Sequence, residues 1–362
     1  FGVRHVRSVI EDSSPSVGED AHLDLEEIRQ EAKRKLAPGC VVCAACNGIV
    51  CAGRMPGMGG IGTGASFKNN YDALAAYRLN MRTLHSVAEP DISARLWGHT
   101  LALPVLGAAV AGGKTNLGGA IEEEDLAWAF VGGAKAAGTF AMTGDGPLPI
   151  FLESGLKAIA RAGGYGIPVI KPRPLPDILE RVQRAVDAGA VAIAIDVDAA
   201  ALLPMTRAGQ PVGPTPPEKV RELAARIPLP LILKGIMTVD EALIAAEAGA
   251  AGIVVSNHGG RSLDHLAGTA EVLPEIAAAV KGRLAILVDG AVRTGADVLK
   301  MLALGADAVL VGRPLAIMAV GGGAEGVELY LRKLADELRT AMLLTGCPSP
   351  AAATPRLVRK AG

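Results

Sequence analysis

Residues 251–263 of the chain, AGIVVSNHGGRSL, join a short apolar run to a polar segment that contains two glycines. The run Ala251–Val255 is typical of a buried strand of a parallel sheet. In a parallel barrel the chemistry lies at the carboxyl ends of the strands, and His258 and Arg261 fall there. An imidazole and a guanidinium three positions apart predict a site that oxidises a small anion. Gly259 and Gly260 allow the backbone to approach a flat ligand closely.

Similar apolar runs alternate with helical patterns from Leu101 onward, which predicts repeated strand and helix units. Ile178, Val182 and Ala185, for example, have helical spacing and predict a face that packs on the outside of a sheet. The expected strands are Leu101–Ala108, Thr139–Thr143, Ile167–Lys171, Val191–Val197, Leu229–Lys234, Ala251–Val255, Leu284–Val288 and Ala308–Val311. Eight strands can close a barrel. We therefore predict an α/β fold, a TIM (β/α)8 barrel over residues 101–362, after an N-terminal extension over residues 1–100.

The composition limits the kind of ligand. The 362 residues include 36 basic and 37 acidic side chains, with a net charge of -1 and no basic stripe interleaved with aromatic residues. This pattern predicts a small-molecule ligand and no nucleic acid. No uninterrupted apolar run reaches the roughly 18 residues that a membrane span needs, and the N-terminus lacks a basic and apolar leader pattern. We expect no membrane association and a cytoplasmic protein.

The extension contains two further segments. Leu23–Leu36 is a charged amphipathic pattern that predicts a helix, whose expected role is packing or oligomer contact. Residues 47–66 are rich in glycine, and residues 56–65 read PGMGGIGTGA. A loop of this length predicts a segment that lies over a ligand.

Four of the five cysteines, Cys40, Cys43, Cys46 and Cys51, lie close together in the extension. An odd count with tight clustering argues against a secreted disulfide framework. The spacing suits tetrahedral zinc or an iron-sulfur cluster, because both take four soft donors around one point. Four free thiols or a redox disulfide are the alternatives. Cys347 stands alone, and we expect it to be buried in packing.

Two glycine-containing segments end the last two expected strands. Asp289–Arg293 reads DGAVR and Gly312–Pro314 reads GRP, and a helical pattern follows each. Phosphate sites in such barrels lie between these two loops, where backbone N–H groups, a helix N-terminus and an arginine meet. The segments predict a phosphate site, with simple tight turns as the alternative.

Charged residues also end the fourth and fifth expected strands. A buried Lys234 needs a partner anion. A cofactor that becomes anionic on reduction could supply that charge, as could an aspartate of the neighbouring strand. Asp196 and Asp198 point to the same side of their strand, and we expect Asp198 to orient the His258 imidazole. Metal binding by the two carboxylates, or a raised pKa caused by their repulsion, is the alternative.

These segments together resemble the FMN-dependent α-hydroxy acid oxidase and dehydrogenase family, the group of glycolate oxidase and lactate oxidase. The resemblance is specific from about Leu229 to the end of the chain. It is carried by LKGI at 233–236, VSNHGGR at 255–261, VDGAVR at 288–293, VLK at 298–300 with LGA at 304–306, and VGRP at 311–314. A weaker match continues upstream, in residues 64–65, 70–73, 79–82 and 91–93.

The resemblance implies a TIM barrel that holds FMN at its carboxyl mouth. Lys234 would face the N1/O2 edge of the flavin, His258 would take a substrate proton, and Arg261 would bind the substrate carboxylate. The residues that it places around the cofactor are Lys234, Ser256, Asp289, Gly290, Ala291, Arg293, Gly312, Arg313, Ala109 and Thr143. A homotetramer is also expected from the resemblance, with oxygen or a redox protein as the electron acceptor.

The chain departs from the family pattern in three places. A substrate-contacting tyrosine is expected near Gly60, and a second tyrosine, with a glutamine nearby, is expected within Ile167–Lys171; neither tyrosine is present. The loop after the fourth strand is short, and Arg207 is the candidate for the second arginine that binds the substrate carboxylate. The cysteines are not part of the family pattern either.

We therefore predict an FMN enzyme that oxidises a small 2-hydroxy acid to a 2-oxo acid. The alternative is an FMN barrel enzyme of another reaction class, an isomerase or a reductase with a cysteine-bound iron-sulfur or zinc site. The missing tyrosines favour the alternative, whereas His258 with Arg261 favours the oxidation. A non-catalytic flavin protein is disfavoured, because a structural site does not need Lys234, Asp198, His258 and Arg261 together.

Overall fold

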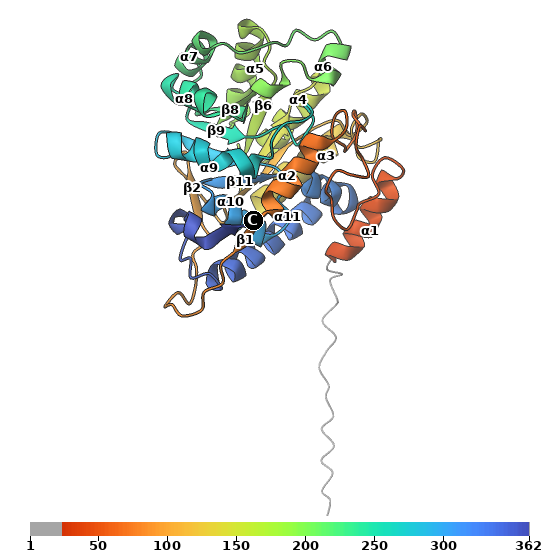
Figure 1. Cartoon of the computed structure of the whole chain (residues 1–362). Helices are drawn as coiled ribbons and strands as arrows, with labels where there is room; N and C mark the ends of the chain where they lie inside the picture. Colours follow the sequence, from red (N-terminus) through yellow and green to blue (C-terminus); the bar gives the residue numbers. More distant parts are fainter. Residues whose placement is uncertain (1–23, 362) are drawn as a thin grey trace, which may run out of the picture.

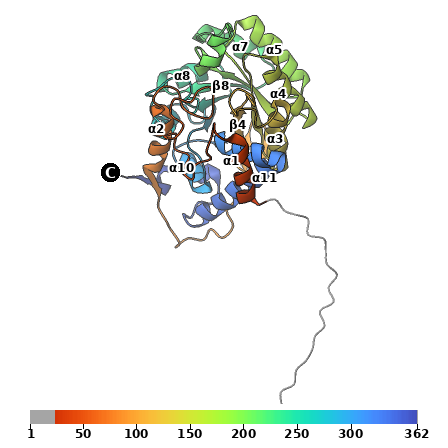
Figure 2. The ribbon, with the colours of Figure 1, turned by 90° about the vertical axis from the view of Figure 1, so that its right-hand side faces the viewer.

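The computed structural model describes residues 24–361, and its centre is a closed barrel of parallel strands surrounded by helices (Figures 1 and 2). The barrel strands are β4 (Val105–Val110), β5 (Ala141–Gly144), β6 (Gly166–Ile170), β7 (Ile193–Asp196), β8 (Leu231–Ile236), β9 (Gly252–Val255), β10 (Ala285–Val288) and β11 (Ala308–Val311). They follow one another around the barrel in chain order, and β11 closes it by pairing with β4. The predicted TIM barrel is confirmed.

Helices follow the barrel strands along the chain, and most of them cover the outside of the barrel. They are α3 (Glu123–Ala136), α4 (Pro149–Arg161), α5 (Leu175–Asp187), α6 (Leu203–Arg207), α7 (Pro217–Arg226), α8 (Val239–Glu247), α9 (Thr269–Val280), α10 (Gly295–Ala303) and α11 (Arg313–Leu343). The expected inner face of α5, with Ile178, Val182 and Ala185, is buried. At the start of α10 the Thr294 hydroxyl accepts from the Asp297 N–H, and the Asp297 carboxylate accepts from the Thr294 N–H, so a capping box fixes the helix beside Arg293.

Every predicted strand run overlaps a barrel strand, but the first prediction begins too early. Leu101 belongs to β3 (His99–Leu101), which pairs with β2 (Ala94–Leu96) in a hairpin. Barrel strand β4 begins after Pro104, because proline lacks the N–H that a central strand needs. The indole N–H of Trp97, in the hairpin turn, donates to the Ala251 carbonyl at 3.2 Å. The hairpin therefore covers the amino end of the barrel and leaves the carboxyl end for ligands.

Side chains that alternate along the strands form two apolar layers. Leu106, Met142, Ile167, Val254 and Leu310 are among those that fill the barrel interior. Their neighbours on the strands face outward and pack against the helices. The barrel is a packed core, so a ligand can enter only at its mouth.

The extension packs against the barrel helices. Its first helix, α1 (Leu25–Leu36), lies along α11 in both views (Figures 1 and 2). The expected helix is confirmed, although Leu23 lies outside the described residues. Ile28, Ala32 and Leu36 are buried, and a Cβ at Gly321 would lie 2.1 Å from the Ile28 carbonyl oxygen. This close contact supports the packing role.

The rest of the extension is joined to the barrel in two ways. Helix α2 (Ala65–Ala75) packs on α9, and β1 (Tyr77–Leu79) pairs antiparallel with β12 (Val358–Lys360). The short 3-10 turns are Val197–Ala199, Pro350–Ala352 and Pro355–Leu357. None of the helices within residues 24–361 is both long and apolar enough to cross a membrane.

Candidate active site

A cleft of about 1290 Å³, partly open to solvent, lies at the carboxyl mouth of the barrel. This volume includes open solvent at the mouth, and the more enclosed space is about 180 Å³. Most predicted site residues line it: Lys234, His258, Arg261, Asp289, Gly290, Ala291, Arg293, Gly312, Arg313 and Ala109. The loops after separate barrel strands bring these side chains together.

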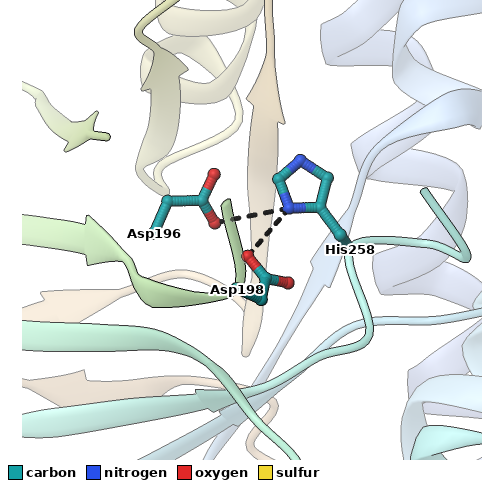
Figure 3. Close-up of side chains that lie close together, drawn as sticks. All are labelled: Asp196, Asp198 and His258. Carbon is teal, nitrogen blue, oxygen red and sulfur yellow. Dashed lines mark hydrogen bonds and ion pairs between the residues drawn. The ribbon is translucent and has the colours of Figure 1, made fainter. Parts of the chain in front are cut away.

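His258 lies in the wall of the cleft with two carboxylates behind it (Figure 3). Its Nδ1 is 2.9 Å from Asp198 Oδ1 and 3.6 Å from Asp196 Oδ1. His258, Gly259 and Gly260 all have positive φ, and the Ser256 hydroxyl accepts the His258 backbone N–H at 3.0 Å. This left-handed turn directs the ring toward the carboxylates, and the expected pairing of Asp198 with His258 is present in the structure.

Asp196 is the centre of a buried charge network. Its register opposite Lys234 on the neighbouring strand places its Oδ1 2.9 Å from Lys234 Nζ, and its Oδ2 accepts from Lys171. Burial opposes both charges. Nevertheless, attraction from Asp196, Asp198 and Asp289 raises the pKa of Lys234, and the charges of His258 and both lysines hold the pKa of Asp196 well below its usual range. Lys234 is therefore a cation and Asp196 an anion at neutral pH.

Arg261 and Arg313 are cations without a carboxylate partner among residues 24–361. Arg261 donates to the Gly57 carbonyl and to Asn116 Oδ1, the latter at 2.9 Å. Burial, with the nearby charge of Arg313, lowers the pKa of Arg261 to about 9. An uncompensated buried charge is costly, so these guanidinium groups favour an anionic ligand in the cleft.

Arg313 holds the glycine-rich loop. It donates to the carbonyls of Met58, Gly59 and Gly259 at 2.7, 3.2 and 2.9 Å, and it stacks 3.7 Å above the Phe67 ring. Burial lowers its pKa to about 10. The expectation that the loop lies over the ligand site agrees with these contacts.

The end of the cleft next to β10 has polar atoms that match a phosphorylated polyol. Asp289 Oδ2 accepts from the Ser256 hydroxyl at 2.8 Å, whereas Asp289 Oδ1 is buried without a partner. Burial raises the pKa of Asp289. The Arg293 Nε–H is also buried without a partner, beside the start of α10. A ribityl hydroxyl can donate to the free carboxylate oxygen, and a phosphate can accept from the arginine, so these residues fit FMN.

The comparisons with known proteins place the chain in a family. The sequence pattern of the FMN-dependent dehydrogenase family matches residues 57–218 and 205–360. The chain belongs to this family. Glycolate oxidase 3 of Arabidopsis thaliana is 32% identical over 325 residues, which cover 78% of this chain and 85% of that protein. The expected kinship with the α-hydroxy acid oxidases is confirmed, as is the enzyme class, an FMN-dependent oxidoreductase.

Other relatives match only part of the chain at higher identity. The 4-hydroxymandelate oxidase of Amycolatopsis orientalis is 52% identical over 145 residues, 40% of each chain. The L-lactate oxidase of Lactobacillus jensenii is 48% identical over 138 residues, 38% of this chain and 33% of that protein. The matched stretch thus spans two fifths or less of the length of these two relatives.

Solved structures of mandelate oxidase share the fold of this FMN-dependent dehydrogenase family member. The complex with (S)-2-phenylpropionate has a TM-score of 0.75 and 34% identity, covering 92% of this chain and 97% of the other. A mandelate oxidase variant with a monooxide FMN adduct has a TM-score of 0.71 and 39% identity, covering 83% of this chain and 93% of the other.

Three predicted positions lie elsewhere than expected. The Ser256 hydroxyl is used by Asp289 and the His258 N–H, so Ser256 supports the site from behind. Thr143 does not line the cleft: Met142 fills the barrel interior, so Thr143 points outward and packs against Gly155 of α4. Arg207 is exposed at the end of α6, outside the cleft, because the short loop does not reach back over the mouth.

The structure describes all five cysteines, and the metal site expected at four of them stays a prediction. Cys40, Cys43, Cys46 and Cys51 are half-buried free thiols, so the described structure contains no redox disulfide there, and Cys347 is buried as expected. Within residues 24–361, the side chains that bring three potential metal-ligand atoms within 4.8 Å are Asp196, Asp198 and His258, not the cysteines. The close tetrahedral set expected for zinc is therefore absent from the described residues.

The sequence did not reveal several polar residues of the cleft wall. Lys171 pairs with Asp196, Asn116 positions Arg261, and Asp145 forms a buried ion pair with Arg173 at 3.2 Å. Lys171 stood out only as a charge in an apolar strand, and the others lie in loops without periodicity. Lys171 falls within residues 167–171, where the family's second tyrosine was expected.

Proposed function

We propose that the protein oxidises a small 2-hydroxy acid to the 2-oxo acid. When bound, FMN would supply the acceptor for two electrons. Asp198 accepts the hydrogen of His258 Nδ1, which leaves Nε2 with its lone pair for a substrate proton. Asp196 and Asp198 stabilise the imidazolium that forms, and Arg261 binds the substrate carboxylate. The observation that carries this proposal is the pairing of His258 with Asp198 in the same cleft as the uncompensated Arg261.

The cofactor end would be held by Asp289 and Arg293, through the free carboxylate oxygen and the free Nε–H. Lys234 lines the same cleft and stays cationic, which favours a flavin that gains negative charge on reduction. The glycine-rich loop would exclude water by its contacts with Arg261 and Arg313. The relatives named as glycolate, lactate and 4-hydroxymandelate oxidases support a 2-hydroxy acid as the substrate class.

The charged wall of the cleft favours one alternative. Lys171, Asp196 and Asp145 line the cleft, and Lys171 lies in the stretch 167–171 where the family's tyrosine was expected. An FMN-dependent isomerase or reductase that acts on a polar substrate is the second candidate. An FMN protein that no 2-hydroxy acid reduces would favour this second candidate.

The remaining expectations stay predictions. These are the electron acceptor, oxygen or a redox protein, the homotetramer and the cytoplasmic location. The domain boundary near residue 100 stays a proposal as well. Strand β1 of the extension pairs with β12, which follows the barrel, so the two parts share a small sheet.

The first experiment is anaerobic titration of the purified protein with glycolate, lactate and mandelate, followed by the flavin absorbance. We expect one of these acids to bleach the flavin bands. His258→Ala should retain FMN, and the rate at which the acid bleaches the flavin should fall at least about 100-fold, the lower range for removal of a catalytic acid or base. His265→Ala, a change of an exposed histidine in the same loop, is the matched control. Bleaching that persists unchanged in His258→Ala would refute the assigned role.

A further inference from the structure

The loop that carries Cys40, Cys43, Cys46 and Cys51 has no part in the proposed oxidation. It is nevertheless firmly anchored. Arg29 of α1 donates to the carbonyls of Val42, at 3.1 Å, and Cys43, and the cleft residue Arg293 donates to the Cys46 carbonyl at 3.3 Å. The loop thus connects the first helix of the extension with the phosphate end of the cleft.

The four thiols of this loop form one group. All are free and half-buried, and their separations of two, two and four intervening residues allow a short loop to wrap around one centre. Thiolates gathered in this way repel one another unless a metal shares their charge.

The separation of the sulfurs distinguishes between two kinds of metal centre. A single zinc with bonds of about 2.3 Å to sulfur holds its four Sγ atoms roughly 3.8 Å apart. No three cysteine sulfurs in the described part of the chain lie within 4.8 Å of one another. In a cluster of four irons each thiolate binds a different iron, which places the sulfurs about 6 Å apart. The four thiols therefore do not form the compact set that a single zinc ion needs, and a cluster is the four-thiolate centre that remains.

The surroundings also suit an anionic cluster. Arg313, which has no carboxylate partner in residues 24–361, donates to the Gly59 carbonyl, and Gly59 packs so closely on the Cys51 carbonyl that a Cβ there would lie 1.9 Å from its oxygen. The Val42 N–H donates to Cys40 Sγ at 3.4 Å, the kind of contact that tunes cluster sulfurs. Val42 itself has φ 47°, unusual for a β-branched residue, so the loop is held in a conformation that its own preference does not supply.

We propose that Cys40, Cys43, Cys46 and Cys51 bind a four-iron, four-sulfur cluster, one cysteine to each iron. Binding deprotonates the four thiols, and Arg313 and Arg293 offset the negative charge of the cluster. The proposal does not depend on which acid the barrel oxidises. It adds a second redox-capable group on the phosphate side of the cleft.

The test is the metal content of the full chain purified without air. We expect about four iron and four acid-labile sulfide per chain, one FMN, and a broad absorbance near 400 nm that dithionite bleaches. One zinc per chain would overturn the cluster. So would four thiols that remain titratable after incubation with ferrous iron, sulfide and a reductant.

Variants identify the ligands. Cys43→Ala and Cys46→Ala should each lower the iron content at least several-fold, and Cys347→Ala, a change of the buried cysteine outside the group, should leave it unchanged. FMN content and circular dichroism are measured on every variant, so that misfolding is recognised. Iron that survives Cys43→Ala and Cys46→Ala at the wild-type level would overturn the ligand set. His258→Ala should keep its iron, which separates this proposal from the proposed oxidation.

Discussion

Among single residues, Asp145 and Arg173 show how the cleft wall is kept rigid. Both side chains are 3% exposed, and Arg173 also donates to Gln210 Oε1 at 2.6 Å and to the Gly146 carbonyl at 2.8 Å. Such a pair is weak evidence for stability as a whole, but removal of one partner leaves an uncompensated charge. The wall therefore depends on both charges being present.

Asp145→Ala should lower the free energy of unfolding by about 3–5 kcal/mol, because it leaves the Arg173 guanidinium buried without its carboxylate. Urea unfolding followed by circular dichroism measures the change. The double variant Asp145→Ala/Arg173→Met should lose less than the single variant. Equal losses in the two would show that the charge of Arg173 is not what destabilises the protein.

Asp264 gives a pH dependence to the glycine-rich loop. Burial opposes its charge, but hydrogen bonds from Thr63, Ser66 and His265 lower its pKa to about 2. Its pKa in the unfolded chain is about 3.9, so its contribution to stability is complete above that value and disappears as the pH falls from about 4 to 2.

Asp264→Asn should remove this part of the acid sensitivity. We expect the wild type to lose more free energy of unfolding than the variant between pH 6 and pH 3, with the difference growing toward lower pH. Urea unfolding at several pH values measures it. Parallel stability curves for the two proteins would contradict the role of Asp264.

At the scale of elements, the contact between α1 and α11 explains why the extension stays attached. Ile28 is 1% exposed and packs against Gly321 and Gly322, whose missing side chains allow the helices to approach closely. Helix α1 has only 12 residues and would be marginal alone, so its stability comes from this packing.

Ile28→Ala should therefore lower the free energy of unfolding by about 2–5 kcal/mol, through lost burial and the cavity that remains. Glu27→Ala, a change on the exposed face of α1, is the matched control and should change stability by less than about 0.5 kcal/mol. Chemical denaturation of both variants measures the effect. If Ile28→Ala speeds proteolysis near α1 but leaves the global free energy of unfolding unchanged, the helix unfolds separately from the barrel.

The elements also show what a sequence can and cannot predict. The barrel strands were predictable because buried parallel strands are nearly continuous apolar runs. Asp289 and His258 were predictable as site residues because each lies just after such a run, at the carboxyl end of a strand. The orientation of Thr143 was not, because a shift of one residue turns a side chain to the other face of a strand. The Asp145–Arg173 pair joins residues 28 positions apart in two loops, and no local pattern marks such a contact.

For the whole molecule, FMN should act as a stabilising ligand. A ligand at 100 times its dissociation constant adds about 2.7 kcal/mol to the stability of the folded state. Removal of FMN should thus lower the melting temperature by about 5 °C or more, given roughly 2–4 °C for each kcal/mol in a large domain. Differential scanning calorimetry with and without added FMN measures this. His258→Ala should show the same shift, whereas Arg293→Ala should show a smaller one; equal shifts in both would contradict the phosphate role of Arg293.

The contact of Arg261 with the Gly57 carbonyl has a consequence for affinity. The Arg261 guanidinium, which we propose binds the substrate carboxylate, already donates to the loop carbonyl of Gly57. A carboxylate that accepts from the same N–H groups would have to replace that carbonyl. The measured binding free energy would then be the difference between the interaction of Arg261 with the ligand and its interaction with the loop. A change in the loop that strengthens its hold on Arg261 would weaken substrate binding without touching the substrate. The glycine-rich segment would thus compete with the proposed substrate for Arg261.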